Sequence, residues 1–495
     1  MRKHIGNGIK IIIFLSILVI SLYLINELIM PKYTLSNNNW PTTSTYYQFY
    51  DMDKDSIDVL FLGSSVVVNS YSPQEIYNTY GIRSYNLASE QQSIFLSYYW
   101  LKEALRFQSP KAVVLDTLFL YPIHQDSPIN TMEGFTRKCL DPMKWSRVKR
   151  EAVSELCKLD SSQSQMSYYL KNLRYHTRWT ELLEQDFVHS EYSYTSLKGL
   201  GPIFDYALQD SYEPYKIGST PESTAEPDAT MLQYLDKTVA LCKENNISLI
   251  LVSQTGNTMN DDINYYLNKY ATDNEIEYIN LCEASHYNAI NPIFPKENIC
   301  DHSNIWGAIK LSNYIGKILK ERYRINSSVD SQYESTKEYY THILKNGNLV
   351  HIENIDEYLK AVIDPNYTVF ITTQNEAAYG ITESTLSQLA SLGLKNSLKQ
   401  KYGYAYAAVI SQENGVTESI SESDTVTLTG TLRNQASIYT VTGTDYFHSS
   451  STITIDGIKY NTQSRGINIV VYDNTLRKVI DSVAFDTHDD SHASR

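Results

Sequence analysis

The sequence predicts an α/β protein with a doubly wound parallel sheet in its first large domain. A β-rich C-terminal domain follows this domain, and one N-terminal transmembrane helix precedes it. Three patterns support this: strands alternate with helices between residues 58 and 322, an apolar run opens the chain, and strand-like runs dominate the last third. Alternating strands and helices favour a parallel sheet. We expect a cytoplasmic tail at 1–10, a membrane anchor at 11–30, the first domain at 31–325, a linker at 326–339 and the second domain at 340–495.

The N-terminal run is long enough to cross a membrane. Apolar residues fill 11–25 and return at 28–30, after several basic residues that include Arg2, Lys3 and Lys10. About 20 such residues span the hydrocarbon core, and the basic flank stays in the cytoplasm, which places the remaining chain outside. A cleaved signal peptide is the alternative. No small-x-small cleavage site follows the run, and this favours an uncleaved anchor in the cell membrane.

Composition excludes some classes of function. The 495 residues carry a net charge of −14 and no long basic run, which argues against nucleic acid as a partner. None of the five cysteines has the spacing of a metal site, so we expect no metal and no cofactor. The 41 tyrosines suit stacking on sugars wherever they are exposed.

In the first domain, strands are predicted at 59–62, 84–87, 112–115, 248–252 and 276–279. Helices are predicted at 73–80, 93–107, 229–244, 263–271 and 305–322, with an irregular, tyrosine-rich middle. Sites in such sheets lie at the carboxyl ends of the strands.

The Ser-rich segment Asn326–Tyr339 reads as a linker. In the second domain we expect a helix at 382–392, ending at Gly393. Strands are expected at 369–373, 405–410, 425–429, 451–455 and 467–472.

Two segments of the first domain combine into a candidate catalytic site. Gly63-Ser64-Ser65 follows a buried strand, where a glycine permits a sharp turn that exposes a hydroxyl group. His302 precedes the last helix, and histidine is the usual base for a serine nucleophile. Either feature alone is common in proteins, whereas the pair at the two ends of one α/β domain is more specific.

These segments, with Tyr85–Ser93 and DHSNIWGAIK, resemble the SGNH/GDSL superfamily over about Asp51–Arg324. The likeness is to its bacterial cell-surface branch, the D-alanyl-lipoteichoic-acid and alginate-acetylation type. The run Arg174–Phe187 also resembles a segment of the surface members. The resemblance implies that Ser65 is the nucleophile and His302 the base. It places Asn304 and Gly307 in the HLNxxG pattern, and assigns Ala88, through its N–H, and Asn304 to the oxyanion site.

The sequence departs from the family pattern at the acidic residue of the triad. Ile299 stands where the family has its aspartate, and Asp301 lies next to His302. Three alternatives follow: Asp301 serves as the third member, a Ser–His dyad operates, or activity is lost. Ala88 replaces the usual glycine but keeps its N–H, and the family's oxyanion asparagine after Leu115–Asp116 is not found.

Two segments of the second domain, Asn366–Lys395 and Ser464–Asp490, resemble the interleukin-like EMT inducer domain. That domain is a lectin-like β-sandwich also found in the stem of a protein O-mannose N-acetylglucosaminyltransferase. The order of its segments is reversed here, so this copy resembles a circular permutation. The resemblance implies a carbohydrate site at Arg465, Asn375, Glu376, Tyr404 and Tyr406. The alternative is that Arg465-Gly466 only forms a tight turn into a strand.

Together these resemblances imply a serine-dependent acyl-ester hydrolase or O-acyltransferase outside the cytoplasm. Its acceptor would be cell-surface polysaccharide or teichoic acid, and family analogy suggests a membrane-bound acyl-donor protein as partner. The alternative is a catalytically inactive, membrane-anchored glycan-binding or scaffold protein of the cell envelope.

Overall fold

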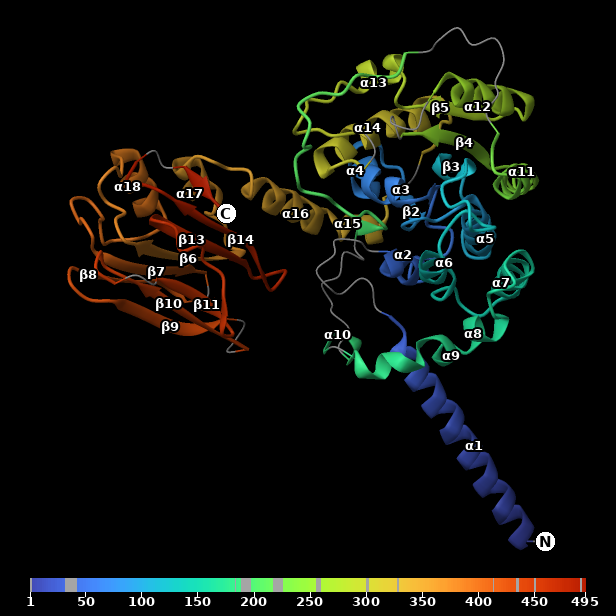
Figure 1. The fold of residues 1–495 in the computed structure, drawn as a ribbon, viewed down its shortest axis with the longest axis horizontal. Helices are drawn as coiled ribbons and strands as arrows, with labels where there is room; N and C mark the ends of the chain where they lie inside the picture. The colour runs from blue at the N-terminus through green and yellow to red at the C-terminus, as the bar shows by residue number, and fades with distance from the viewer. Residues whose placement is uncertain are drawn as a thin grey trace. The chain divides into compact units, whose positions relative to one another are not determined.

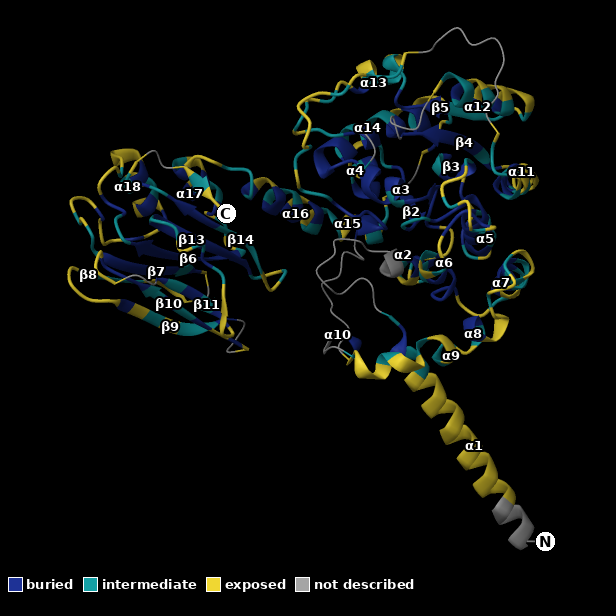
Figure 2. Cartoon of the chain, viewed as in Figure 1, coloured by how far each residue is buried: buried dark blue, intermediate teal, exposed yellow. Residues whose placement is uncertain are grey.

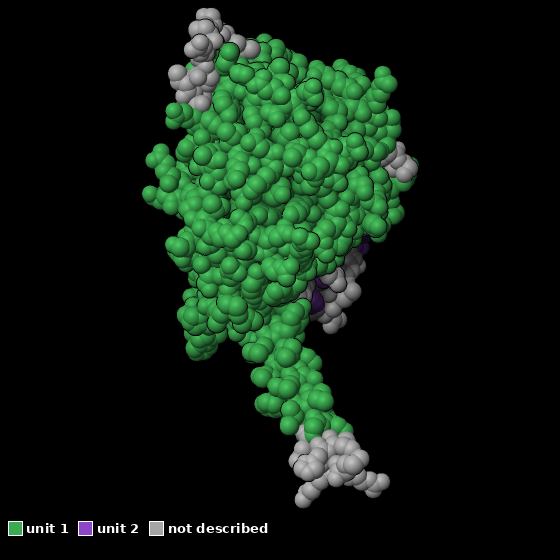
Figure 3. Space-filling model, turned by 90° about the vertical axis from the view of Figure 1, so that its right-hand side faces the viewer, with its two compact units in different colours: residues 1–340 green, residues 341–495 purple. Residues whose placement is uncertain are grey.

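The computed structural model describes twelve segments of the chain, which form two compact units, Met1–Tyr340 (unit 1) and Thr341–Arg495 (unit 2). Figure 3 shows unit 1 in green. The predicted fold class is confirmed: unit 1 contains a parallel sheet covered by helices, and unit 2 is rich in antiparallel strands. The described residues are 2–31, 42–182, 184–187, 197–216, 226–254, 260–299, 302–326, 329–412, 414–432, 436–448, 451–489 and 492–495.

The sheet of unit 1 has five strands in the order β2-β1-β3-β4-β5, and every pairing is parallel. Since all strands run the same way, their carboxyl ends meet at one edge, where the chain can bring distant side chains together. The strands are β1 Val59–Gly63, β2 Ser84–Ala88, β3 Ala112–Asp116, β4 Ser248–Ser253 and β5 Glu277–Asn280.

Side chains alternate between two cores on opposite faces of this sheet. Leu60 and Leu62 of β1 join the core beneath α5 and α11, whereas Val59 and Phe61 join the core beneath α4 and α14. A strand buried on both faces reads as a continuous apolar run, as β1 does. Figure 1 shows the helices on both sides of the sheet. They include α3 Ser65–Ser70, α4 Pro73–Tyr80, α5 Ile94–Ala104, α11 Ala229–Glu244, α12 Asp261–Asp273, α13 Ala284–Ile290 and α14 Ile305–Glu321.

The middle of unit 1, which the sequence analysis left irregular, contains short helices. Only α7 has a clear apolar face, which buries Val148, Ala152, Val153 and Leu156. The segments are α6 Glu133–Leu140, α7 Arg147–Leu159, α8 Gln165–Tyr169, α9 Asn172–Tyr175, η2 His176–Thr180 and α10 Glu184–Phe187; α2 Thr42–Phe49 and η1 Leu118–Leu120 lie outside this region. Helices of four or five residues bury too few side chains to leave a periodic pattern in the sequence.

The N-terminal helix α1, Arg2–Ile29, projects from the body of unit 1 (Figures 1 and 3). Its stretch Gly8–Ile29 is long and apolar enough to cross a membrane. Its side chains are exposed from Gly8 to Ile25, whereas Ile29 and the following Met30 are buried (Figure 2). By length and composition this helix meets the requirement for a membrane span, which a signal sequence also meets.

The segment expected to be a linker is instead partly folded. It contains α15, Ser331–Glu334, and the start of α16, Lys337–Leu349. Tyr333 is fully buried and donates its hydroxyl hydrogen to Ser84 O at 2.7 Å, and Lys198 Nζ donates to Gln332 O at 3.0 Å. The Ser-rich composition suggested a solvated chain, but the buried Tyr333 and these hydrogen bonds attach the segment to the rest of unit 1.

Unit 2 is a β-sandwich with helices on one outer face. One sheet has the order β15-β14-β13-β6-β7-β8 and the other the order β12-β11-β10-β9. Phe370 of β6 and Val441 of β10 meet in the core between the sheets, whereas Val369 and Ile371 face the core beneath α17 and α18. The elements are β6 Tyr367–Gln374, β7 Ala405–Ser411, β8 Gly415–Ser421, β9 Val426–Leu432, β10 Ser437–Gly443, β11 Thr452–Ile455, β12 Ile458–Lys459, β13 Gly466–Asp473, β14 Lys478–Phe485, β15 Ala493–Ser494, α17 Ile355–Ala361 and α18 Glu383–Ser391.

The strand β13 lies near the middle of the six-stranded sheet, between β14 and β6. Its first residue, Gly466, has φ +102°, and a Cβ there would lie 2.0 Å from Phe485 O. The backbone of β14 therefore excludes any side chain at this position, and this explains the glycine after Arg465.

We predict that Gly466→Ala destabilises unit 2 far more than Gly415→Ala does. Both glycines have positive φ, which costs an alanine about 1–2 kcal/mol, but only Gly466 also faces backbone, since nothing lies within 4 Å of the Cβ position at Gly415. Proteolysis of residues 341–495 in the full chain, measured against urea concentration, gives the free energy of unfolding. Equal losses in the two variants would contradict the close contact with Phe485.

Candidate active site and candidate ligand pocket

A tight turn joins β1 to α3 and presents the two serines. Gly63 has φ +147°, and a Cβ there would lie 2.5 Å from the Cβ of Asp116 on the neighbouring strand β3. Ser64 caps α3 in an extended conformation, and Ser65 is the first residue of the helix. The glycine thus lets β1 approach β3 closely while the chain reverses into the helix.

Ser65 and His302 form a hydrogen-bonded pair. Ser65 Oγ lies 2.8 Å from His302 Nε2, although 237 residues separate them in the chain. Both side chains are half-buried, so the pair is not sealed inside the core. This distance is that of a normal hydrogen bond and permits proton transfer from the hydroxyl group to the imidazole.

Ser64 has a different environment. It is fully buried, and its Oγ donates a hydrogen bond to Asp116 Oδ2 at 2.8 Å. The backbone N–H of Leu118 donates to Asp116 Oδ1 at 3.0 Å. Burial raises the pKa of Asp116 above its ordinary value, and the hydrogen bonds from Leu118 and Ser64 partly offset this effect. Ser64 therefore ties the turn to β3, and Ser65 alone of the two reaches the histidine.

Asp116 was not among the predicted site residues, although its position in the sequence carried one signal. Asp116 ends a buried apolar strand at the same sheet edge as the serine turn. A charged residue in that place needs a hydrogen-bonding partner, and the turn supplies it.

A second polar residue at this edge, Gln254, binds the segment that carries His302. Gln254 is buried, and its Nε2 donates to Ser303 Oγ at 2.9 Å and to Ile299 O at 3.5 Å. The same nitrogen bonds Ser70 Oγ at the end of α3. This amide therefore connects the residues on both sides of His302 to the helix that begins with Ser65. It follows β4 directly, and the sequence analysis passed over it as well.

The position of the family's aspartate carries no carboxylate. The side chain of Ile299 is buried among apolar residues of the α4–α14 core. Asp301, the predicted third member of the triad, lies outside the described residues. The carbonyl of His302 accepts a hydrogen bond from Asn298 Nδ2 at 3.2 Å, which helps to fix the backbone at the histidine.

The side chain of Asn304 is engaged in local structure. Its Oδ1 accepts from Gly307 N at 3.0 Å as the cap of α14, and its Nδ2 donates to Asp205 O and Lys296 O at 3.1 and 2.9 Å. Both amide hydrogens are thus in use, so an oxyanion could bind this group only if one bond broke. Gly307 is required for the same cap, because a Cβ there would lie 1.8 Å from Asn298 O.

Ala88, the other predicted oxyanion residue, ends β2 and pairs in register with Gly63. Its backbone is therefore one strand away from the serine turn. After His302 in the chain, the buried Trp306 of α14 contacts Tyr206 and Phe204, with ring centroids 5.2 and 6.5 Å apart.

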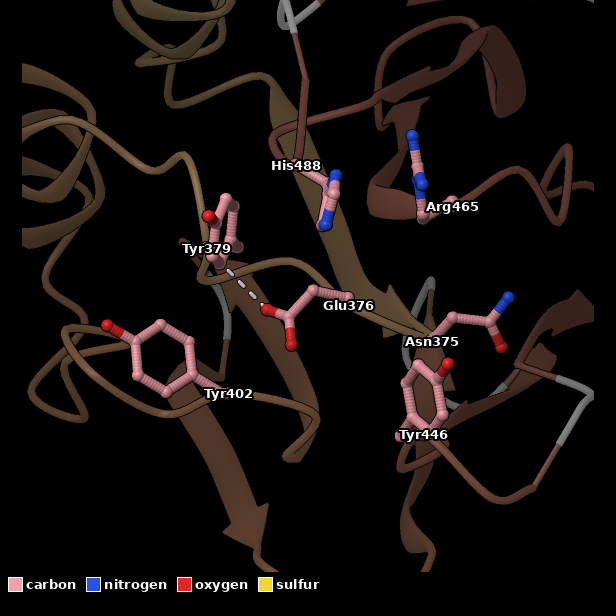
Figure 4. A pocket seen from close by; sticks show the side chains of 7 residues that line it. All are labelled: Asn375, Glu376, Tyr379, Tyr402, Tyr446, Arg465 and His488. Carbon is pink, nitrogen blue, oxygen red and sulfur yellow. Dashed lines mark hydrogen bonds between the residues drawn. The ribbon is translucent and has the colours of Figure 1, made fainter.

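Unit 2 contains an open pocket of about 530 Å³ (Figure 4). Its lining includes Arg465, Asn375 and Glu376, three of the predicted carbohydrate-binding residues, and Arg465 lies far from the other two in the chain. Four further residues complete the lining: Tyr379, Tyr402, Tyr446 and His488. The pocket therefore combines aromatic faces with charged and amide groups, which can stack on a ligand and form hydrogen bonds with it.

The aromatic residues of this pocket differ from those expected. The Tyr406 ring is buried and its hydroxyl group bonds Glu418 at 2.9 Å, so it cannot stack on a ligand, and the prediction for Tyr406 is corrected. Tyr404 is half-buried and is not part of the lining. Instead, Tyr379, Tyr402 and Tyr446 are exposed at the pocket. Tyr402 belongs to the tyrosine-rich run 402–406 in which stacking residues were expected, whereas Tyr379 and Tyr446 were not expected, because they lie in loops that come together only in the folded unit.

Ion pairs and hydrogen bonds fix the polar groups of the pocket. Arg465 binds Asp486 through two nitrogens, with the shortest distance 2.7 Å, and it also pairs with Asp489. These hydrogen bonds raise the pKa of Arg465 further. Glu376 accepts from the backbone of Ala378 and Tyr379, at 2.6 and 3.0 Å, as the dashed line in Figure 4 shows in part.

Comparisons with known proteins give little further information. No protein-family model and no curated protein matches the sequence. Two solved structures resemble part of the chain: a presumed acylhydrolase from Bacteroides fragilis NCTC 9343 and a GDSL-like lipase from Bacteroides thetaiotaomicron VPI-5482. The first is 11% identical with a TM-score of 0.26 and covers 56% of this chain and 94% of its own. The second is 12% identical with a TM-score of 0.26 and covers 57% of this chain and 99% of its own. Values this low carry no conclusion about activity.

Proposed function

We propose that the chain is a membrane-anchored serine hydrolase or O-acyltransferase that acts on acyl esters of cell-surface polysaccharide or teichoic acid. The observation that carries this proposal is the 2.8 Å contact between Ser65 Oγ and His302 Nε2 at the carboxyl edge of a parallel sheet. A nucleophile within hydrogen-bonding distance of a base is the minimum arrangement for covalent acyl transfer.

The reaction follows from this pair. Ser65 Oγ attacks the ester carbonyl carbon while His302 Nε2 takes the hydroxyl proton. The backbone N–H of Ser65, which has no acceptor within its own helix as an N-terminal residue, is a donor for the oxyanion, with Ala88 N–H as the second. The alcohol leaves with the proton from His302. Water, or a sugar hydroxyl group, then attacks the acyl-serine and regenerates the enzyme.

The end of α1 supports an anchor that is retained. Asn26 Oδ1 accepts from Asn172 N at 2.9 Å, and Arg178 donates to the carbonyl groups of Ile29 and Met30 at 3.2 and 3.3 Å. Removal of α1 would break these contacts and expose the buried Met30. A cleaved signal peptide has no such role in the fold.

The pocket of unit 2 supports a glycan-binding role for this unit. Tyr379 stacks on His488 with ring centroids 4.8 Å apart, and Tyr402 lies 6.3 Å from Tyr379. Exposed rings beside Arg465 and Glu376 offer both a stacking surface and groups that bond sugar hydroxyls. The likeness to a lectin-like domain agrees with this role.

The alternative is a catalytically inactive, membrane-anchored protein of the cell envelope that binds glycan or acts as a scaffold. The observation that favours it is Ile299, which places an apolar side chain where the family has its carboxylate. A histidine without that carboxylate loses orientation and charge stabilisation. The enzyme function therefore requires that Asp301 or another group replaces the carboxylate, and the inactive protein does not.

We predict that Ser65→Ala abolishes both acyl-ester hydrolysis and labelling by a fluorophosphonate. Ser64→Ala should keep the labelling at a reduced rate, because it removes one hydrogen bond to Asp116 and leaves the nucleophile in place. Hydrolysis of p-nitrophenyl acetate by the full chain in detergent gives the rates. Equal labelling of Ser65→Ala and the unchanged protein would exclude the enzyme function.

We predict that Asp301→Asn lowers hydrolysis about 10³-fold or more if Asp301 orients His302, in line with the loss of a triad carboxylate. If a Ser–His dyad operates, Asp301→Asn leaves the rate of hydrolysis nearly unchanged. Ile299→Asp is then the variant to test for an increase in that rate. The same hydrolysis assay separates these cases. A silent His302→Ala would contradict both arrangements and favour the inactive protein.

We predict that Tyr379→Ala and Tyr402→Ala each weaken binding to purified teichoic acid and capsular polysaccharide about tenfold, or about 1.4 kcal/mol. Tyr404→Ala is the matched control, since Tyr404 lies two residues away but outside the pocket lining. Calorimetry on the full chain gives the affinities. A larger loss in Tyr404→Ala than in Tyr402→Ala would move the glycan site away from this pocket.

A further inference from the structure

A band of exposed apolar side chains lies beside the end of α1. It belongs to residues 165–182 and 184–187, which include α8, α9, η2 and α10 and which we call the collar. Figure 1 shows the collar at the end of unit 1 from which α1 emerges. Its exposed large side chains are 48–69% accessible: Met166, Leu170, Leu173, Trp179 and Phe187. The surface of a soluble protein rarely has this many exposed apolar side chains within one short segment. Such patches mark interaction sites.

The collar is joined to α1 by a set of hydrogen bonds. Lys171 Nζ lies 3.4 Å from Glu27 Oε1, and the backbone N–H of Asn172 donates to Asn26 Oδ1 at 2.9 Å. Arg178 donates to the carbonyl groups of Ile29 and Met30 and forms a two-armed ion pair with Asp186, with both contacts at 2.9 Å. The collar is therefore held at the level of residues 26–30 and cannot swing away without breaking these bonds.

The length of α1 determines how deep residues 26–30 lie in a bilayer. The span Gly8–Ile29 has 22 residues, or about 33 Å at 1.5 Å per residue, which matches a hydrocarbon core of about 30 Å. Residues 26–30 then lie at the boundary between acyl chains and headgroups. Tryptophan concentrates at this depth in membrane proteins, and the collar contains Trp179, which is 69% exposed.

We propose that the collar is a membrane-contact surface, which lies in the headgroup region and buries its exposed apolar side chains among lipid. This inference rests on the anchoring part of the proposed function and does not depend on catalysis. Short amphipathic helices bind a bilayer in this way, with apolar residues inserted about 5–10 Å. The collar, with α1, gives unit 1 two points of attachment, and these restrict its rotation about the axis of α1.

Tryptophan quenching in proteoliposomes tests this inference on the full chain. Phosphatidylcholine brominated near the headgroup quenches only tryptophans at the membrane surface. We expect it to lower the emission of the unchanged protein, and we expect Trp179→Phe to reduce that decrease. Trp145, which is 70% exposed and whose ring centroid lies 5.0 Å from that of Tyr169 of α8, accounts for the remainder. Trp306→Phe is the matched control, because Trp306 lies on α14 and is almost fully buried. Leu170→Gln with Leu173→Gln should also reduce the quenching, since it removes apolar contact with lipid.

Two outcomes would overturn the inference. In the first, Trp179→Phe leaves the quenching unchanged while the protein still floats with the vesicles after an alkaline wash. In the second, quenching is absent and Leu173→Cys forms a disulfide-linked pair, which assigns the collar to a second copy of the chain. Failure to float would instead contradict the anchor itself. Labelling of Ser65 reports on catalysis separately.

Discussion

The hydrogen bond between Ser64 Oγ and the buried carboxylate of Asp116 fixes the turn on which the candidate active site depends. A hydrogen bond to a charged group contributes about 1.5–3 kcal/mol, and a buried carboxylate left without donors costs more. Because the turn supplies the donor, β1 and β3 approach until no side chain fits at Gly63. Ser65 is then directed away from β3 and toward His302. The chemical role of one serine thus rests on the structural role of its neighbour.

Much of the fold could be predicted from the sequence because its strongest signals are local. The five parallel strands are short apolar runs between helices, and each was expected within one or two residues of its observed bounds. The helices of the collar and α15 left no such signal, since they are short and their partners are distant in the chain. Tyr333 shows the reason: its contact with Ser84 crosses 249 residues.

The residues of the candidate sites also fall into two groups: those that the sequence predicts and those that it does not. Ser65 and His302 could be identified because each follows a recognisable local pattern, and the structure places them 2.8 Å apart. Asp116 and Gln254 act through partners that come near only at the edge of the folded sheet. Their residue types alone therefore did not predict a role in the site. In unit 2, Arg465 follows from a motif, whereas Tyr379 and Tyr446 come from loops whose meeting no sequence pattern encodes. Side chains that act through tertiary contacts are the part that sequence reasoning misses.

The position of β13 determines how unit 2 can be made. This strand comes near the end of the described chain, yet it pairs with β6, which precedes it by about a hundred residues. Until β13 has been synthesised, the backbone N–H and C=O groups on one edge of β6 have no strand to pair with, and an open strand edge invites aggregation. A chain released early would therefore present a ready substrate for quality-control proteases. A chain truncated before β13 cannot complete this sheet, so it cannot form the folded unit 2.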